Sequence, residues 1–249
     1  MKIDIWSDIV CPFCYLGKRR LEAAVATFEH RDELEITWHS YELDRNAPAV
    51  SDEDIVDRIA NKYGTTREAA TAQHESLAQA GADLGVEFNW DRVRHGNTFD
   101  AHRVVHLADE QGLADAAIER LMKAYFTDGL PVGDRDTLVQ LASEIGLDGP
   151  SVHAMLESEG YGNHVRSDEA TAKMLGIEGV PFFVFDRKYG VSGAQPPEVF
   201  TQALQQAWDT QHEALEPVAA GGGCGGGGCA CGGGGCGCGH GGCGGACAP

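Results

Sequence analysis

A short strand that leads directly into a pair of cysteines constrains the fold of this chain most. Residues 3–6 read Ile-Asp-Ile-Trp, and this alternation predicts a buried strand that ends just before the first cysteine. Proline is tolerated in the first turn of a helix, so an amphipathic helix is predicted to begin near Pro12. Cys11 and Cys14 therefore lie at a predicted helix N-terminus, one helical turn apart. The helix is indicated by apolar side chains at helical spacing, namely Leu21, Ala24, Val25 and Phe28.

The order of the remaining elements is equally informative. Residues 34–43 alternate apolar and polar side chains and predict a second strand. From residue 51 to residue 175 the apolar spacing is helical, which predicts a bundle of five to seven helices. Residues 180–185 and 189–191 then predict a hairpin, and a last helix carries Val199, Phe200, Ala203, Leu204 and Trp208. The predicted order is strand, helix, strand, helical segment, hairpin and helix.

The composition of the chain changes abruptly at Ala220. Residues 221–249 contain 17 of the 33 glycines and seven of the nine cysteines, and no apolar side chain larger than alanine except Pro249. Such a segment cannot bury enough surface to offset the entropy of ordering its glycines. We therefore expect a disordered Gly/Cys-rich tail from residue 214 to residue 249.

The early cysteine pair is the principal candidate for chemistry. The positive end of a helix stabilises a thiolate, which is the species that attacks a disulfide. Cys11 is then the expected nucleophile and Cys14 the resolving thiol, while Pro12 and Phe13 between them are expected to contact the substrate. Phe13 offers no charge or hydrogen bond to a thiolate, which favours a reductase or isomerase over a strong oxidant. The alternative is half of a zinc site, which would need a second pair of ligands.

Pro181 opens an apolar run that otherwise predicts a central strand, where a missing backbone N–H is unfavourable. A cis bond between Val180 and Pro181 would explain its presence and leave the Val180 backbone free to pair with a substrate chain. An ordinary proline on an edge strand is the alternative.

At this point the sequence resembles the DsbA-like thioredoxin-fold oxidoreductases, in the cytosolic branch labelled FrnE-like. The matching stretches occur in the family's order and are Ser7–Tyr15, Asn97–Arg103, Gly179–Val184 and Ser192–Gln195. The resemblance implies an α/β thioredoxin fold formed by residues 1–50 and 176–213, with a large all-helical insertion at residues 51–175. It also implies a redox-active cysteine pair faced by a cis proline.

The sequence also resembles a second branch of the same superfamily, which provides an alternative enzyme activity. The 2-hydroxychromene-2-carboxylate isomerases are similar over most of the length, but they bind glutathione through a serine where Cys11 stands. Asn97 and His102 either line a pocket above Cys11 and contact the substrate, or belong to a helix N-terminus packed under the cleft. Gln195 is similarly either a contact near the cleft or only a turn residue.

The tail has a candidate chemistry of its own, because its cysteines repeat with a period of seven. A third hypothesis for the chain is a metal-binding protein that holds Zn(II) or Cu(I) through this tail. The alternatives are disulfides within the tail, oxidation by the early pair, or a low-complexity segment without a role. The proposed ligands are Cys224, Cys229, Cys231, Cys236, Cys238, His240, Cys243 and Cys247.

Charge and hydropathy limit the partners. The formal net charge of −19 disfavours nucleic acid, whose phosphates such a surface repels. No apolar window is long enough for a membrane span, and the first residues lack the features of a signal peptide. We therefore expect a cytoplasmic protein, monomer or homodimer, that requires no cofactor. Its expected partners are thiol or disulfide substrates, either proteins or low-molecular-weight thiols.

Overall fold

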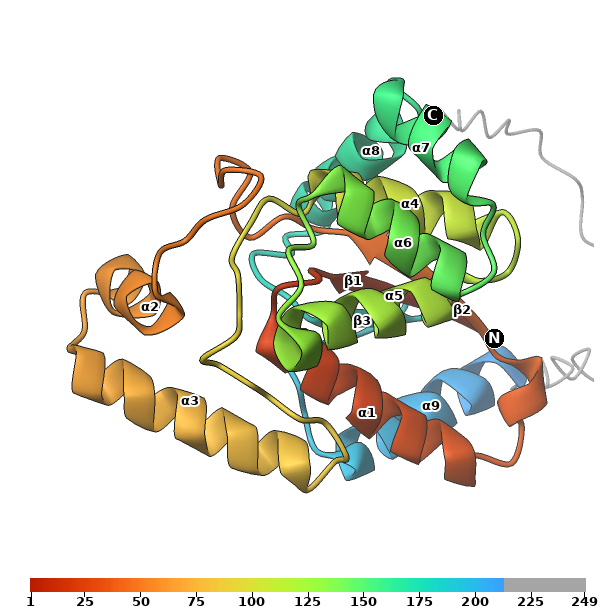
Figure 1. Cartoon of the computed structure of the whole chain (residues 1–249). Coiled ribbons are helices and arrows are strands. Elements are labelled where there is room, and N and C mark those ends of the chain that lie inside the picture. Colours follow the sequence, from red (N-terminus) through yellow and green to blue (C-terminus); the bar gives the residue numbers. More distant parts are fainter. Residues whose placement is uncertain (213–249) are drawn as a thin grey trace, which may run out of the picture. The chain divides into compact units, whose positions relative to one another are not determined.

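The structure is a computed structural model that describes residues 1–212. The predicted tail, with its seven late cysteines and His240, lies outside the described residues. Within residues 1–212 the chain forms four strands and nine α-helices (Figure 1). None of these helices has the length and apolar character that a membrane crossing needs.

The four strands form one mixed sheet in the order β2-β1-β3-β4. Strand β1 runs parallel to β2 and antiparallel to β3, and β3 runs antiparallel to β4. This is the sheet of a thioredoxin fold, as the sequence predicted. The strands are β1 (Lys2–Ser7), β2 (Glu35–Ser40), β3 (Phe182–Phe185) and β4 (Tyr189–Ser192).

Two helices that are far apart in the sequence pack together on one face of the sheet. They are α1 (Pro12–Thr27) and α9 (Pro197–His212), and α9 also contacts β3 and β4 (Figure 1). The strand side chains on this face are buried, because side chains at alternate positions of a strand point to the same side. They include Ile3, Ile5, Phe183 and Phe185.

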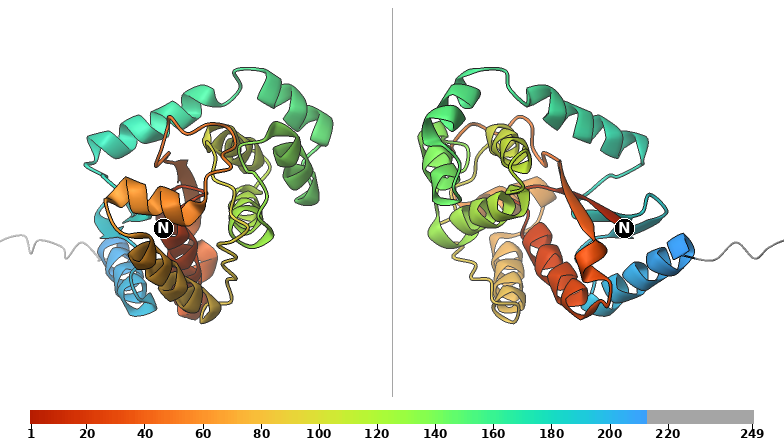
Figure 2. Two further views of the ribbon diagram at one scale, coloured as in Figure 1. Left: turned by 60° about the vertical axis from the view of Figure 1, so that its left-hand side comes forward. Right: turned by 90° about the vertical axis from the view of Figure 1, so that its right-hand side faces the viewer.

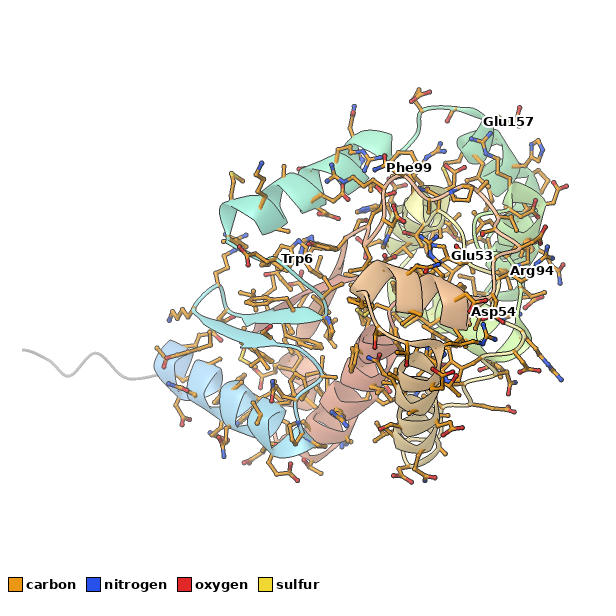
Figure 3. All side chains as sticks on the ribbon, turned by 90° about the vertical axis from the view of Figure 1, so that its left-hand side faces the viewer. Trp6, Glu53, Asp54, Arg94, Phe99 and Glu157 are labelled. Carbon is orange, nitrogen blue, oxygen red and sulfur yellow. The ribbon has the colours of Figure 1, made fainter. Side chains whose placement is uncertain are left out.

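The opposite face of the sheet is covered by α8 (Gly162–Met174), which also contacts β2. Trp6 of β1 packs there against Ala172 and Ile177, in a small cluster separate from the main core. Figure 3 shows Trp6 at this position. The even-numbered positions of β1 therefore face α8, while the odd-numbered positions face α1 and α9.

Seven α-helices lie between β2 and β3, at the upper end of the predicted five to seven. Helix α3 lies beside α1, and α2 lies beside α3 (Figure 2). A π-helical turn (Ala124–Asp128) follows α5 directly. The seven are α2 (Ile55–Tyr63), α3 (Arg67–Ala82), α4 (Phe99–Asp109), α5 (Ala114–Lys123), α6 (Arg135–Glu144), α7 (Gly149–Glu157) and α8.

Several of these helices begin at a polar side chain that accepts hydrogen bonds from free backbone amides. The Asp54 carboxylate accepts from the amides of Val56 and Asp57 at 2.8 and 3.2 Å and so begins α2. Thr66, Asp134 and Asp148 cap α3, α6 and α7 in the same way. These caps add helix-start signals to the helical spacing of the apolar residues in this segment.

Strand β2 ends at Ser40, three residues earlier than predicted. The amide of Leu43 donates to the Asp8 carboxylate at 2.8 Å instead of continuing the sheet. The hydrogen bond to Asp8 therefore holds Leu43 outside the sheet, and Asp8 itself lies three residues before Cys11 in the sequence.

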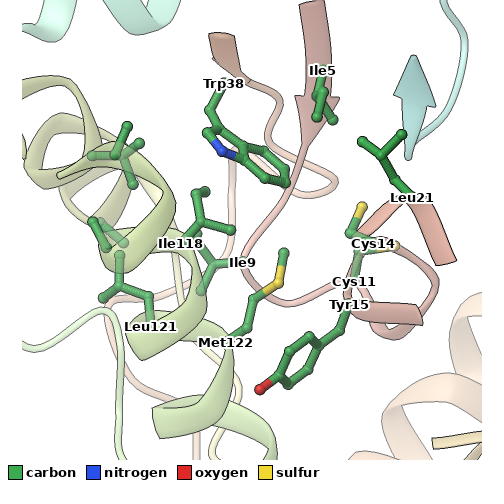
Figure 4. Close-up of a cluster of buried hydrophobic side chains, with 14 of the residues drawn as sticks. Ile5, Ile9, Cys11, Cys14, Tyr15, Leu21, Trp38, Ile118, Leu121 and Met122 are labelled. Carbon is green, nitrogen blue, oxygen red and sulfur yellow. The ribbon is translucent and has the colours of Figure 1, made fainter. Parts of the chain in front are cut away.

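The main core joins the sheet to the helices that lie between β2 and β3 in the sequence. Figure 4 shows Ile5 of β1 and Trp38 of β2 near the buried residues of α5, among them Met122. Cys11 and Cys14 both lie in the same cluster, so both thiols belong to the hydrophobic core of the protein.

Candidate active site

Cys11 is the N-cap residue of α1. Its backbone is extended, with φ −97° and ψ 112°, and Pro12 occupies the first turn of the helix. The carbonyl oxygen of Cys11 accepts from the amides of Cys14 and Tyr15. The backbone amide of Cys11 donates to the carbonyl oxygen of Asp8. This first turn contains no acidic side chain, so the positive end of α1 acts on the Cys11 sulfur without a nearby carboxylate from its own helix.

Both cysteines are buried thiols, and only Cys11 lines a cavity. Cys14 is 1% exposed and Cys11 is 3% exposed. Burial raises the pKa of the Cys14 thiol well above its ordinary value, and the neighbouring Cys11 raises it further. Cys14 is thus held as a neutral thiol within the core, while Cys11 borders a cavity.

The proline predicted to face the cysteines lies beside Cys11. The Val180–Pro181 peptide bond is cis, as expected from the sequence. The Cys11 thiol donates to the carbonyl oxygen of Val180 at 3.6 Å. Pro181 precedes β3, which has a neighbouring strand on both sides, so the interpretation as an edge-strand proline was wrong.

Gly17, which the sequence analysis missed, sets the distance between α1 and Pro181. A Cβ atom on Gly17 would lie 3.0 Å from Cγ of Pro181 and 3.1 Å from Cζ of Phe183. Because these distances are shorter than ordinary carbon contacts, any larger residue at this position would have to displace Pro181 or Phe183. A glycine inside a predicted amphipathic helix was the available signal.

A cavity of about 170 Å³ opens beside Cys11. Pro12, Phe13 and Val180, all predicted to contact the substrate, line it together with Cys11. Phe13 is 44% exposed, although it is a large apolar side chain. The facing walls come from α2, α3 and the segments after them, and include Ile55, Ile59, Leu77, Trp90, His95, Tyr125 and Phe126.

His95 is a second residue of this region that sequence reasoning missed. Its Nδ1 atom lies 3.3 Å from the Tyr125 hydroxyl. Burial, helped by the nearby Arg58, lowers the pKa of His95 to about 4, so its ring is neutral at pH 7. A lone histidine outside any motif gave no signal in the sequence.

Asn97 shapes the start of α4 and is not among the residues that line the cavity. Its side-chain oxygen accepts from the amide of Phe99 at 2.9 Å. Its side-chain nitrogen donates to Glu42 at 3.4 Å and to the carbonyl oxygen of Arg45 at 3.3 Å.

His102 and Gln195 also lie outside the cavity lining. His102 is buried, and its Nε2 atom is 3.3 Å from the Asp8 carboxylate. Gln195 is exposed and donates to the carbonyl oxygen of Ser192 at 2.9 Å. A direct contact between substrate and Asn97, His102 or Gln195 stays a prediction.

The described part of the chain holds no group of three or more His, Cys, Asp or Glu side chains placed to bind a metal ion. Cys11 and Cys14 therefore have no further ligands assembled around them there. The proposed ligands of the tail lie beyond residue 212, and metal binding by them stays a prediction.

Comparisons with known proteins show what this chain is similar to in sequence and fold. The model of a family described as the DSBA-like thioredoxin domain matches residues 2–205. A crystal structure of a probable DsbA oxidoreductase, SCO1869 from Streptomyces coelicolor, is 45% identical with a TM-score of 0.80, over 84% of this chain and 90% of that one. The uncharacterised protein YwbO of Bacillus subtilis is 30% identical, over 81% of this chain and 94% of its own length. The cytosolic disulfide reductase DsbM of Pseudomonas aeruginosa, solved with GSH, is 16% identical with a TM-score of 0.60 and shares the fold, over 84% of this chain and 99% of that one.

Proposed function

The chain belongs to the DSBA-like thioredoxin domain family, and we propose that it is a dithiol reductase or isomerase that acts through Cys11 and Cys14. One observation carries this proposal. Cys11 lies at the N-terminus of α1 and lines a cavity, whereas Cys14, one turn later, is not among the residues that line it. A substrate in the cavity can therefore reach the Cys11 sulfur first.

In the first step the Cys11 thiolate attacks one sulfur of a substrate disulfide. A bond forms between Cys11 and that sulfur, the substrate S–S bond breaks, and the second substrate sulfur leaves as a thiolate. The Val180 backbone lies beside the new mixed disulfide, because its carbonyl oxygen already contacts the Cys11 thiol.

In the second step Cys14 displaces the substrate from Cys11. The departing substrate thiolate takes the Cys14 proton, and the Cys14 sulfur then attacks Cys11. The Cys11–Cys14 disulfide forms and the remaining substrate sulfur leaves as a thiolate, which takes a proton from water. Two electrons have passed from the cysteine pair to the substrate. Once Cys11 is in a mixed disulfide it no longer raises the Cys14 pKa, and only burial does so.

A low-molecular-weight thiol regenerates the pair. Two such thiols reduce the Cys11–Cys14 disulfide and become one disulfide themselves, which restores the electron balance. In isomerisation a second thiol of the same substrate attacks the mixed disulfide instead, and no electrons are lost or gained. We extend the proposal to a cytosolic location, where such thiols keep the pair reduced, and to membership of the FrnE-like branch.

The alternative as a glutathione-dependent isomerase is not part of this proposal. That branch uses a serine at the position where this chain has Cys11. The third hypothesis, metal binding by the tail, rests on residues outside the described part.

Reduction of insulin disulfides tests the proposal. The wild type is compared with Cys11→Ser, with Cys14→Ser, and with a control in which the seven late cysteines are serine. We expect Cys11→Ser to lower the rate by at least about a hundredfold, and Cys14→Ser to accumulate a mixed disulfide visible by mass spectrometry. The control retains the wild-type rate. A Cys11→Ser variant as active as the wild type would refute the proposal.

A further inference from the structure

Two histidines that line the cavity each have one buried imidazole nitrogen without a hydrogen-bond partner within residues 1–212. These nitrogens are Nδ1 of His74 and Nε2 of His95, in side chains of residues that are 5% and 7% exposed. Leaving a buried polar atom without a partner costs about 1–3 kcal/mol. Such atoms are therefore expected to be satisfied by a bound molecule, and both histidines line the cavity beside Cys11.

The size and lining of the cavity restrict that molecule. A volume of about 170 Å³ holds one aromatic ring, since an apolar cavity of about 150 Å³ accepts benzene. It is smaller than the ~300–1,000 Å³ of sites that hold whole drug-sized ligands. Ile55, Leu77, Trp90 and Phe126 make most of the wall apolar, and His74 stacks on Trp90 with ring centroids 4.1 Å apart.

The chemistry of His95 adds one polar requirement. Its ring is neutral, and its Nδ1 atom is engaged by the Tyr125 hydroxyl. The Nε2 atom is a donor in one tautomer and an acceptor in the other. A phenolic hydroxyl both donates and accepts, so it pairs with either tautomer. Charged side chains also line the cavity, namely Asp44, Arg58 and Lys62, but pairing with His95 needs only a neutral group that both donates and accepts.

We propose that this cavity binds a phenolic ring, whose hydroxyl pairs with Nε2 of His95. The inference rests on the proposed function, because Cys11 lines the same cavity and the ring must sit close to the reacting sulfur. A tyrosine next to a disulfide-bonded cysteine in a peptide supplies both a phenolic ring and a sulfur.

Three disulfide-linked peptides that differ only in the residue next to cysteine test the proposal. This residue is tyrosine, phenylalanine or alanine, and kcat/KM for reduction is measured for each with the full-length protein. We expect phenylalanine to exceed alanine by at least about tenfold, because the ring is buried. Tyrosine should exceed phenylalanine by about three- to tenfold, the factor that one neutral hydrogen bond supplies.

Variants of His95 assign this preference to one atom. In His95→Leu the ratio of the tyrosine to the phenylalanine peptide is expected to fall to about one. His95→Gln restores a polar group near Nε2 and should recover part of the ratio. His153→Leu, on the exposed side of α7, is the matched control and should leave both ratios as in the wild type. Circular dichroism shows whether each variant is folded.

Free p-cresol provides a second measurement that needs no variant, and it separates the two sources of a phenol. It should inhibit reduction of the tyrosine peptide by the wild type in competition with that peptide. Inhibition by p-cresol without any preference among peptides would support the phenol site but assign it to a small molecule. No peptide preference and no p-cresol inhibition, with the alanine peptide still reduced, would overturn this inference alone. Failure to reduce any peptide would instead refute the proposed function.

Discussion

The thiol of Cys11 donates a hydrogen bond to the carbonyl oxygen of Val180, although the two residues are 169 positions apart in the sequence. The antiparallel pairing of β1 and β3 brings them together, because Trp6 near the end of β1 lies opposite Phe182 at the start of β3. Whatever follows β1 must then lie beside whatever precedes β3. The sheet itself thus places the reactive sulfur next to an available backbone carbonyl.

Iodoacetamide should label Cys11 before Cys14. Burial raises the Cys14 pKa, so at neutral pH a smaller fraction of this thiol is present as the reactive thiolate. In the variant that lacks the late cysteines we expect at least a roughly tenfold difference in rate at pH 7, and Cys14 labelling should accelerate only at strongly alkaline pH. Peptide mass spectrometry over time measures both rates, and equal rates would contradict the different surroundings of the two thiols.

Gly17→Ala should lower both stability and activity. The added methyl group would press on Pro181 and Phe183, and overpacking of this kind costs about 1–3 kcal/mol. The higher helix propensity of alanine offsets at most about 1 kcal/mol of this. A displaced Pro181 also changes the surroundings of Cys11, so insulin reduction should slow. Gly179→Ala is the matched control, because no atom lies within 4 Å of its added methyl group. Unchanged activity of Gly17→Ala would mean that Pro181 need not be held so close to α1.

The His39 ring should make stability depend on pH. Its two nitrogens contact Asp168 at 2.8 Å and Asp4 at 2.9 Å, and these carboxylates raise the His39 pKa despite burial. A raised pKa stabilises the fold fully below the unfolded value of about 6.5, and this contribution is lost as pH rises through the folded value. Contacts with His106 and His39 lower the Asp168 pKa against the effect of burial, so its contribution is lost as pH falls below about 4.

Urea unfolding of the wild type and of His39→Gln measures this contribution. The wild type should be more stable by about 1–3 kcal/mol at pH 5.5, and the difference should shrink at pH 9. His153→Gln replaces an exposed histidine and serves as the control. A difference that stays constant between the two pH values would show that the charge on His39 does not contribute.

The sheet and its flanking helices were predictable from the sequence because the strands show period-2 patterning or short apolar runs and the helices show helical spacing. Ile3 and Ile5 face α1 and α9 while Trp6 faces α8, and this alternation is visible without a structure. The end of β2 was not predictable, because a carboxylate from another segment, Asp8, determines it. The family, inferred from four short matching stretches, is confirmed by the match over residues 2–205.

The candidate site also has one part that was predictable from the sequence and one part that was not. Cys11 and Cys14 have a recognisable spacing, and Pro181 breaks a strand pattern, so their chemistry shows in the sequence. The far wall of the cavity could not be predicted, because Trp90, His95 and Tyr125 come from loops and helix ends that only the packing of the helices between β2 and β3 brings together. Periodicity reports which side of a helix is buried, but not which other helix it meets.

Arg103 illustrates a motif residue whose role in the structure is architectural. Its guanidinium donates to the carbonyl oxygens of Met155 and Ser158 at 2.6 Å and of Gly160 at 2.7 Å, and so satisfies the carboxyl end of α7. It also pairs with Asp100 at 2.6 Å. Replacing one partner of a buried charged network typically costs about 3–5 kcal/mol, so Arg103→Met should be strongly destabilised in urea.

The same substitution should leave catalysis almost unchanged in those molecules that remain folded. Arg103 does not line the cavity beside Cys11, so insulin reduction per folded molecule should match the wild type. Arg103→Lys should regain only part of the stability, because lysine cannot reproduce the planar fork of donors that reaches several carbonyl oxygens at once. Arg187, which is exposed in the turn between β3 and β4, provides the control substitution Arg187→Met. Lost activity with unchanged stability would instead place Arg103 in the path of the substrate.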